Sequence, residues 1–330
     1  MTLTNKNTYK PEILAISYRN NAIENLHYGW ICVLNKQHEI IYRKGNVSNP
    51  TFLRSVAKPI QAICLIEDKI NVHAKELAII CGSHSGTEKH LKVLSGFMKK
   101  QKLKESYLQC GIHLPFDENE KNILIKSNRK PSKLHNNCSG KHSGMLSVCK
   151  KNKWDLMSYL NIKHPLQQRI LKNIKDLSNT NKIRLGTDGC GAPTFSLPIK
   201  NIAMAFSVFT DPLSKKYKPI INSMNSNPFY VGGNGQIDTE VMKVLKGNLI
   251  VKSGGAGIII AAKEGNSIVI KMAEGSSNIR SFVLLKILTG LGWLNVKKIK
   301  DTILEEILSG QLKNHTGKLI GKIVFEGRVN

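Results

Sequence analysis

The chain carries strand-type segments at both of its ends and helical segments between them. Residues 13–18 and 28–42 have the apolar, β-branched character of strands, and a polar turn inside the second segment predicts a hairpin. Residues 248–263 and 267–272 have the same character on either side of a Glu-Gly-Asn turn. One antiparallel sheet built from both ends, with a helical region inserted, is the simplest arrangement for this order.

The middle of the chain is mostly helical. Residues 55–67 and 76–81 are apolar segments, and the second ends at small polar residues that favour a tight loop. Helical patterns continue from residue 88 to about 246 and return at 278–308. We therefore expect a single α+β domain over residues 1–330, with sheet parts at 12–45 and 248–330 and a helical part at 55–247.

The composition favours a cytoplasmic protein. No apolar run approaches the roughly 18–20 residues that span a bilayer, and the first ten residues are polar without a signal-peptide pattern. The number of cysteines, seven, is odd, and most lie in apolar surroundings, so a disulfide framework is not expected. Cys138 and Cys190 differ because they lie in polar, glycine-containing loops.

The net charge of +26 raises the question of a polyanionic partner. The charge comes mostly from lysines spread along the whole chain, whereas arginine, the usual reader of bases and phosphates, is scarce. We expect no specific nucleic-acid site and no membrane partner, and a polyanion-binding surface remains the alternative.

A serine and a lysine stand three residues apart at Ser55 and Lys58, a spacing that places both on one helical face. A neutral lysine there can take the proton of the serine hydroxyl and make it a nucleophile. The spacing alone is weak, since it recurs twice elsewhere. Lys58 lies in an apolar segment, so burial should lower its pKa. Lys252-Ser253-Gly254 then follows a strand, and this pair of motifs is typical of serine β-lactamase-like enzymes.

Two polar loops carry the remaining candidates, at residues 135–142 and 187–193. Each contributes one cysteine, and two cysteines with a nitrogen ligand can hold zinc with one position open. His135 or His142 would be the ordinary nitrogen ligand, because a lysine must lose its proton before it ligates. A hydrogen-bonded loop without metal is the alternative.

Four sequence blocks, taken in order, resemble the rhizobial-type L-asparaginases of the asparaginase II family. The blocks are residues 54–59, 81–86, 134–144 and 188–195, and the likeness runs from about residue 12 to about 275. This resemblance implies a three-layer αβα fold like that of serine β-lactamases and penicillin-binding proteins. It also implies a homodimer that hydrolyses L-asparagine to L-aspartate and ammonia.

The resemblance further implies roles for individual residues. The catalytic residues would form two serine–lysine tandems: Ser55 with Lys58, and Ser83 with Lys252. The zinc ligands would be Cys138, Lys141 and Cys190. The weaker candidates for substrate binding are Arg54, Asn137, His142, Asp188 and Gly254.

In the expected mechanism, Ser55 attacks the amide carbon and neutral Lys58 accepts its proton. Ser83 and Lys252 relay a proton to the departing ammonia. Backbone N–H groups near Ser55 and at Gly254 stabilise the oxyanion. The metal, with Asp188, orients the amino acid.

Two stretches depart from the family pattern. Residues 254–257 are Gly-Gly-Ala-Gly where the family carries Gly-Ala-Glu-Gly, and residues 235–239 keep only the acidic end of a Gly-Arg-Phe-Asp-Thr-like stretch. Other activities therefore stay open: a glutaminase or another amidohydrolase of this fold, a catalytically lapsed binding protein, or an enzyme whose nucleophile is Cys138.

Overall fold

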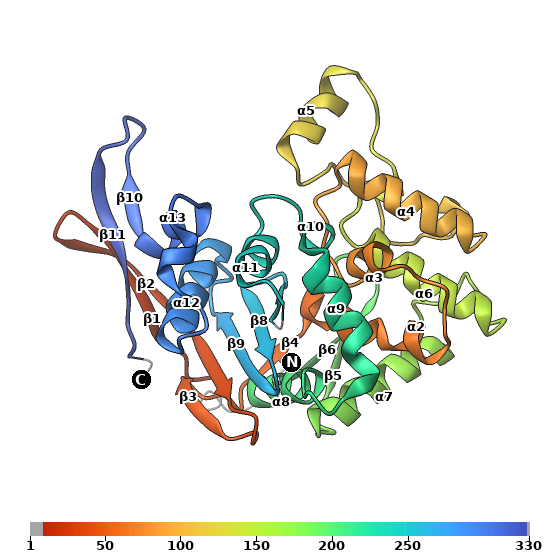
Figure 1. Ribbon diagram of the computed structural model, residues 1–330, viewed down its shortest axis with the longest axis horizontal. Coiled ribbons are helices and arrows are strands. Elements are labelled where there is room, and N and C mark those ends of the chain that lie inside the picture. Colours follow the sequence, from red (N-terminus) through yellow and green to blue (C-terminus); the bar gives the residue numbers. More distant parts are fainter. Residues whose placement is uncertain (1–8, 248, 329–330) are drawn as a thin grey trace.

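The two ends of the chain meet in one antiparallel sheet. The structure, a computed structural model, describes residues 9–247 and 249–328, and in this part of the chain the sheet has eight strands (Figure 1). Their order is β10 (Gln311–Lys313), β11 (Leu319–Phe325), β1 (Glu12–Arg19), β2 (Ala22–Leu34), β9 (Asn266–Met272), β8 (Ile258–Lys263) and β7 (Ile250–Ser253), with β3 (Ile40–Lys44) also paired to β2.

The predicted sheet from both termini is confirmed. Strand β1 pairs with β2 on one side and with the C-terminal strand β11 on the other, so the red and blue ends of the chain lie side by side in Figure 1. Two details differ from the expectation. The segment 248–263 forms two strands instead of one, separated by the turn at 254–257. The strands β10 and β11 fall within the expected sheet part at 248–330 but are not predicted individually, because β10 has three residues and Gly321 and Lys322 interrupt the apolar residues of β11.

Helices cover the central strands. Helices α8 (Ile199–Phe209) and α12 (Ser277–Gly290) both pack against β8 and β9. These strands are buried at nearly every position, which requires cover on both of their faces. Polar bonds fix the contact with α8, since the Ser267 hydroxyl donates to the Ala203 carbonyl at 2.8 Å.

The helical region between the sheet parts lies to the right in Figure 1. Its helices are α1 (Lys58–Gln61), α2 (Ile63–Glu67), α3 (Ala74–Ile80), α4 (Glu88–Lys100), α5 (Glu118–Lys126), α6 (Ser139–Lys151), α7 (Pro165–Ser178), α9 (Lys218–Ser226), α10 (Pro228–Val231) and α11 (Ile237–Leu245), and α13 (Ile303–Ser309) follows α12. A second sheet of three strands was not predicted: β4 (Pro50–Phe52), β6 (Pro193–Pro198) and β5 (Arg184–Thr187). Strand β6 is buried throughout although Thr194 and Ser196 alternate with Phe195 and Leu197, and it is short and begins and ends at a proline, a residue that is rare inside sheets.

The helix predicted at 55–67 is broken. It starts as the 3-10 turn η1 (Arg54–Ala57), continues as α1 and, after Ala62, as α2. Arg54 itself has φ +48°, a left-handed conformation that costs energy for a residue other than glycine. The strained residue immediately precedes Ser55, at the point where the chain leaves β4.

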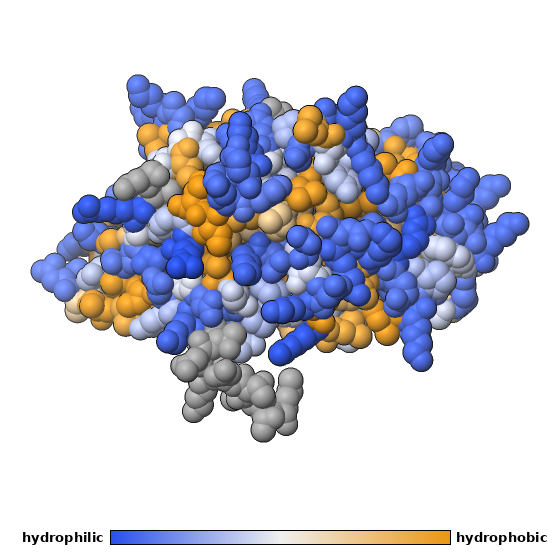
Figure 2. Space-filling model, turned by 90° about the horizontal axis from the view of Figure 1, so that it is seen from below, coloured by the Kyte–Doolittle hydropathy of each residue, from blue (hydrophilic) through white to orange (hydrophobic). Residues whose placement is uncertain are grey.

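On the face shown in Figure 2, hydrophilic residues spread over the length of the molecule and hydrophobic residues lie in patches between them. Within residues 9–247 and 249–328, no helix has the length and apolar character needed to cross a membrane.

Candidate active site

Lys58 lies at the centre of the candidate site and is almost completely buried. Its Nζ donates to the Gly82 carbonyl at 2.6 Å, the Ser83 hydroxyl at 2.9 Å and the Asn137 carbonyl at 3.2 Å. All three acceptors are uncharged, so none of them compensates for the free-energy cost of removing water from an ammonium group. Burial therefore lowers the pKa of Lys58, and the positive charges of Lys141 and Lys252 lower it further, against an opposing effect of the Cys138 thiolate.

Lys252 is equally buried but is held by an acid. Its Nζ lies 2.8 Å from Oδ2 of Asp238 and donates to the Ser253 carbonyl at 2.7 Å. The Asp238 carboxylate also accepts from the Ser253 N–H and hydroxyl, each at 3.0 Å. Burial alone would raise the pKa of Asp238, but the neighbouring Lys252 holds it below its usual value. The result is a buried ion pair joining the start of α11 to β7.

These contacts rearrange the expected tandems. Ser83 is within hydrogen-bond distance of Lys58, whereas the expected contact between Ser83 and Lys252 is replaced by the pair with Asp238. The Ser55 hydroxyl has no hydrogen-bond partner in the described part of the chain, although Ser55 and Lys58 share the turn formed by η1 and α1. Asp238 is not among the predicted site residues, although it is the acidic residue in the stretch 235–239 that matches the family pattern.

Arg54 and Asp188 form one wall beside Ser55. Arg54 Nε donates to Oδ1 of Asp188 at 2.6 Å. Burial alone would raise the pKa of Asp188, but the charges of Lys141 and Arg54 hold it below its usual value. A Cβ added to Gly255 would lie 3.2 Å from the Arg54 guanidinium, so the guanidinium packs closely on that glycine. Arg54 and Lys252 therefore have acidic partners, Asp188 and Asp238, despite the missing family carboxylate at residue 256.

The two loop cysteines and Lys141 form a buried cluster. Lys141 Nζ lies 2.9 Å from Cys190 Sγ, and Cys190 also interacts with Cys138. The hydrogen bond from Cys190, together with the charges of Lys58 and Lys141, holds the pKa of Cys138 well below its ordinary value. The same hydrogen bond, together with burial, raises the pKa of Cys190. The cluster thus brings two sulfurs and one lysine nitrogen together in a buried place.

This donor set fits a zinc ion in its chemistry. Two sulfurs and a nitrogen are ordinary zinc donors and leave one position open. Burial alone would lower the pKa of Lys141, but the effect of Cys138 and Cys190 is larger than that of burial and raises the pKa above the usual value. Metal binding must therefore displace a proton from the Lys141 side chain. Within residues 9–247 and 249–328, no group of three His, Cys, Asp or Glu side chains is arranged for a metal. Any zinc site here therefore depends on Lys141.

The remaining candidates occupy the surrounding shell. His142 Nδ1 lies 2.7 Å from the Tyr159 hydroxyl, its Nε2 is buried without a partner in the described residues, and burial together with nearby lysines lowers its pKa well below the ordinary value. The Asn137 N–H donates to His113 Nε2 at 3.0 Å, which was not expected. His135 caps its own turn through the Ser132 N–H and lies outside the sulfur cluster.

The turn after β7 corrects one expectation. The Gly254 N–H donates to the Ile258 carbonyl at 2.8 Å, so it is not free to stabilise an oxyanion. By contrast, the Ser55 N–H has no acceptor in the described part of the chain. Gly254 lies beside η1, since an added Cβ would be 3.3 Å from the Leu53 carbonyl and 2.6 Å from Ile258.

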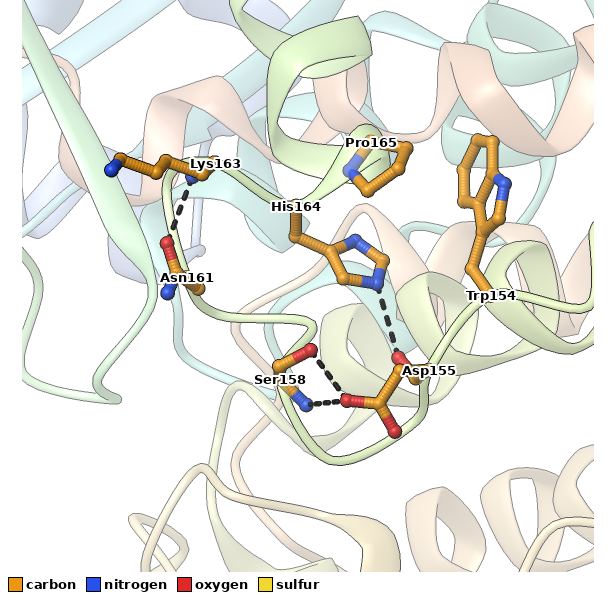
Figure 3. Close-up of a pocket in the computed structure, with 7 residues that line it drawn as sticks. All are labelled: Trp154, Asp155, Ser158, Asn161, Lys163, His164 and Pro165. Atoms are coloured by element: carbon orange, nitrogen blue, oxygen red, sulfur yellow. Dashed lines mark hydrogen bonds between the residues drawn. The ribbon is translucent and has the colours of Figure 1, made fainter.

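A separate hollow, formed by residues 154–165 before and at the start of α7, is a poorer candidate. It has a volume of about 350 Å³ and is drawn in Figure 3. Its polar groups are already used: His164 contacts the Asp155 carbonyl and accepts from the Leu166 N–H, and Asp155 accepts from Ser158. These bonds close a loop and cap α7, so they explain the residues structurally.

Solved structures of Mglu are among the chain's structural relatives. The native form in 4.3 M NaCl has 14% identity and a TM-score of 0.38, covering 81% of this chain and 61% of that one. A second Mglu structure has 12% identity and a TM-score of 0.39, and the match covers 80% of this chain and 67% of that one. The tris and glutamate form of Mglu has 11% identity and a TM-score of 0.39, and the match covers 80% of this chain and 59% of that one. The chain thus spans roughly 60–67% of Mglu, and these likenesses are too weak to assign a function.

No curated protein matches the chain. The sequence profile of the family described as L-asparaginase II matches residues 15–325, nearly the whole length. This match confirms the resemblance carried by the four sequence blocks. The chain belongs to the L-asparaginase II family.

Proposed function

We propose that the chain is an amidohydrolase and, more specifically, an L-asparaginase that converts L-asparagine to L-aspartate and ammonia. The observation that carries the proposal is Lys58, a buried amine with a lowered pKa, 2.9 Å from a serine hydroxyl and one turn from another. Such a lysine is suited to accept a proton at neutral pH. Membership of the L-asparaginase II family supports the reaction class.

In the proposed mechanism, Ser55 is the nucleophile. Its hydroxyl oxygen bonds to the amide carbon of the substrate while Lys58, neutral at that moment, accepts the proton. Among the residues that the structure describes, the hydroxyl has no hydrogen-bond partner, and catalytic hydrogen bonds often form only in the complex. The free N–H of Ser55 is the proposed donor to the oxyanion. The C–N bond then breaks and leaves an acyl-enzyme.

Ser83 connects Lys58 to the leaving group. The ammonium of Lys58 returns its proton through the Ser83 hydroxyl to the departing nitrogen, which leaves as ammonia. Water then attacks the acyl-enzyme, Lys58 again serves as the base, and aspartate is released. Lys252 is proposed to remain charged throughout because Asp238 pairs with it. It acts on Lys58 as a fixed positive charge.

Arg54 and Asp188 are proposed to orient the substrate. Asparagine carries a carboxylate and an ammonium group, and the Arg54–Asp188 pair offers one charge of each sign beside Ser55. Zinc held by Cys138, Lys141 and Cys190 would supply a further fixed positive charge for substrate binding. Asn137 and His142 are proposed to support these loops through His113 and Tyr159.

The finer features of the fold and assembly are proposals as well. Helices on both faces of β8 and β9 support the layering of a serine β-lactamase-like fold. A homodimer and a cytoplasmic location are proposed from the family and from the composition. Light scattering on the purified chain would measure the dimer.

Ammonia release by the purified protein tests the proposal. Asparagine should give faster release than glutamine, and Ser55→Ala should lose about 10³-fold or more of the activity, because no other group replaces the nucleophile. Equal rates on both amides would favour a broader amidohydrolase. Full activity in Ser55→Ala would show that another residue, such as Ser83 or Cys138, is the nucleophile. No ammonia with either substrate, together with salt-sensitive nucleic-acid binding, would favour the lapsed binding protein.

A further inference from the structure

A second cavity lies outside the proposed active site. It has a volume of about 560 Å³ and is bounded by α12, α13, the start of α11 and strand β11 of the main sheet. In Figure 1, α12 and α13 lie between β11 and α11. None of the residues proposed for catalysis, substrate binding or zinc lines it. The cavity is large enough for a small organic molecule.

Arg280, on the first turn of α12, lines this cavity and forms no ion pair with an acid of residues 9–247 or 249–328. Its side chain is 7% exposed, and Nη1 donates to the Gly254 carbonyl at 2.9 Å and the Ile258 carbonyl at 3.3 Å. Its Nε is buried and has no hydrogen-bond partner within the described residues. The acid that acts on Arg280 is Asp238, and that carboxylate is already bonded to Lys252 and Ser253. A buried guanidinium without a carboxylate in contact is left short of negative charge.

The beginning of α12 adds further donors. The helix has 14 residues, and the Ser276 hydroxyl caps the N–H of Ile279. The N–H groups of Ser277 and Asn278 have no acceptor in the described part of the chain, and both residues line the cavity. The positive end of the helix dipole and the Arg280 guanidinium therefore belong to one wall.

The rest of the lining is mixed. Phe282, Ile307 and Ile323 supply apolar surface, and Glu306 supplies a carboxylate that has no ion-pair partner within the described residues. A ligand that fits this lining has an anionic group at one end and an apolar body. The Glu306 carboxylate can additionally receive an ammonium group.

We propose that this cavity is a binding site for a small organic carboxylate with an apolar tail. The carboxylate accepts hydrogen bonds from Arg280 and from the first N–H groups of α12, and the tail packs against Phe282 and the isoleucines. Simple organic acids and amino acids both carry such a carboxylate. Glu306 distinguishes the two, because only an amino acid has an ammonium group to pair with it. The site is independent of the proposed asparaginase reaction.

Three related probes test this site by calorimetry on the full chain: 3-phenylpropanoate, the uncharged 3-phenylpropan-1-ol and L-phenylalanine. The carboxylate should bind at least about tenfold more tightly than the alcohol, because it alone makes charge-assisted hydrogen bonds. Arg280→Gln should remove most of that difference. Arg184→Gln, which removes an exposed arginine of β5, is the matched control and should change nothing.

A second variant covers the case in which Arg280→Gln does not fold. Ser277→Pro removes one N–H donor at a position where a helix tolerates proline, and it should weaken the carboxylate severalfold while the alcohol is unaffected. If L-phenylalanine binds more tightly than 3-phenylpropanoate, and if Glu306→Gln removes this difference in affinity, the cavity is an amino-acid site. The reverse order would identify a simple-acid site. Equal binding of acid and alcohol, or a carboxylate affinity unchanged in the folded variants, would overturn the proposal.

Discussion

Lys58 and Lys252 are both buried lysines of the same site, yet their surroundings differ in one decisive respect. Lys58 contacts two carbonyls and a hydroxyl, whereas Lys252 contacts a carboxylate that itself is held by Ser253. Burial without an opposite charge favours the neutral amine, and burial with one favours the ammonium. From this comparison we propose the proton-accepting role for Lys58 and a fixed charge for Lys252.

Replacing each lysine by arginine separates the two roles most strongly. Arginine keeps the positive charge but does not accept a proton at any ordinary pH. Lys58→Arg should therefore lose about 10³-fold in kcat, within the range for a lost general base. Lys252→Arg should lose about tenfold or less through imperfect packing, because the charge beside Asp238 is retained. Initial rates of ammonia release from asparagine give both values.

Circular dichroism and thermal unfolding of the two arginine variants supply the control for folding. If Lys252→Arg were as damaging as Lys58→Arg in folded protein, Lys252 would be a proton carrier and the comparison would fail.

Removing the Asp238 carboxylate beside Lys252 should lower the stability of the folded protein. Asp238→Asn leaves a buried ammonium without its carboxylate, so the free energy of unfolding should fall by about 3–5 kcal/mol, as for other broken buried pairs. Urea unfolding measures the change. The double variant Asp238→Asn with Lys252→Met removes both charges and should recover much of the loss. A fall of under about 1 kcal/mol in the single variant would mean that the pair is not a compact buried unit.

Metal removal should have a smaller effect. The purified protein should contain about one zinc per chain, and chelation should raise KM for asparagine more than it lowers kcat, because the proposed role is in substrate binding. Metal analysis and rates before and after chelation measure this. Iodoacetamide should alkylate Cys138 only after chelation. A metal-free active enzyme that loses activity on alkylation would point to Cys138 as the nucleophile.

The arrangement of the main sheet could be predicted from sequence because strand periodicity and apolar runs are local signals. The loops at Ser83 and Cys190 could be predicted because small polar residues there interrupt apolar segments, whereas the loop expected at 135–142 is wrong beyond Cys138, since residues 139–142 form the first turn of α6. Strand β6 could not, since its six residues begin and end at prolines, which argue against a strand inside a sheet. Strand β10 has only three residues, Gly321 and Lys322 interrupt the apolar residues of β11, and the pairing of β11 with β1 joins segments that are far apart in the chain.

The partners of the site residues were harder to predict than the residues themselves. The contact of Ser83 with Lys58, and of Lys252 with Asp238, depends on how α3, α11 and β7 pack together. Spacing along the chain carries no information about such contacts. The hydrogen bond that occupies the Gly254 N–H also arises from the geometry of the turn to β8. No sequence pattern predicts a role for Arg280, because its burial without an acid in contact results from the packing of α12 on the sheet.

The pH dependence of kcat, compared between the wild type, Lys252→Arg and Lys252→Met, tests most directly the claim that Lys252 is a fixed charge acting on a neutral Lys58. The wild-type rate should fall as the pH drops through the lowered pKa of Lys58, well below the ordinary lysine value, because protonation removes the base. Lys252→Arg should keep that pH midpoint. Lys252→Met should move it to higher pH, because loss of a nearby positive charge raises the pKa of Lys58. An unchanged midpoint in folded Lys252→Met, or a wild-type midpoint near 10.5, would contradict the account.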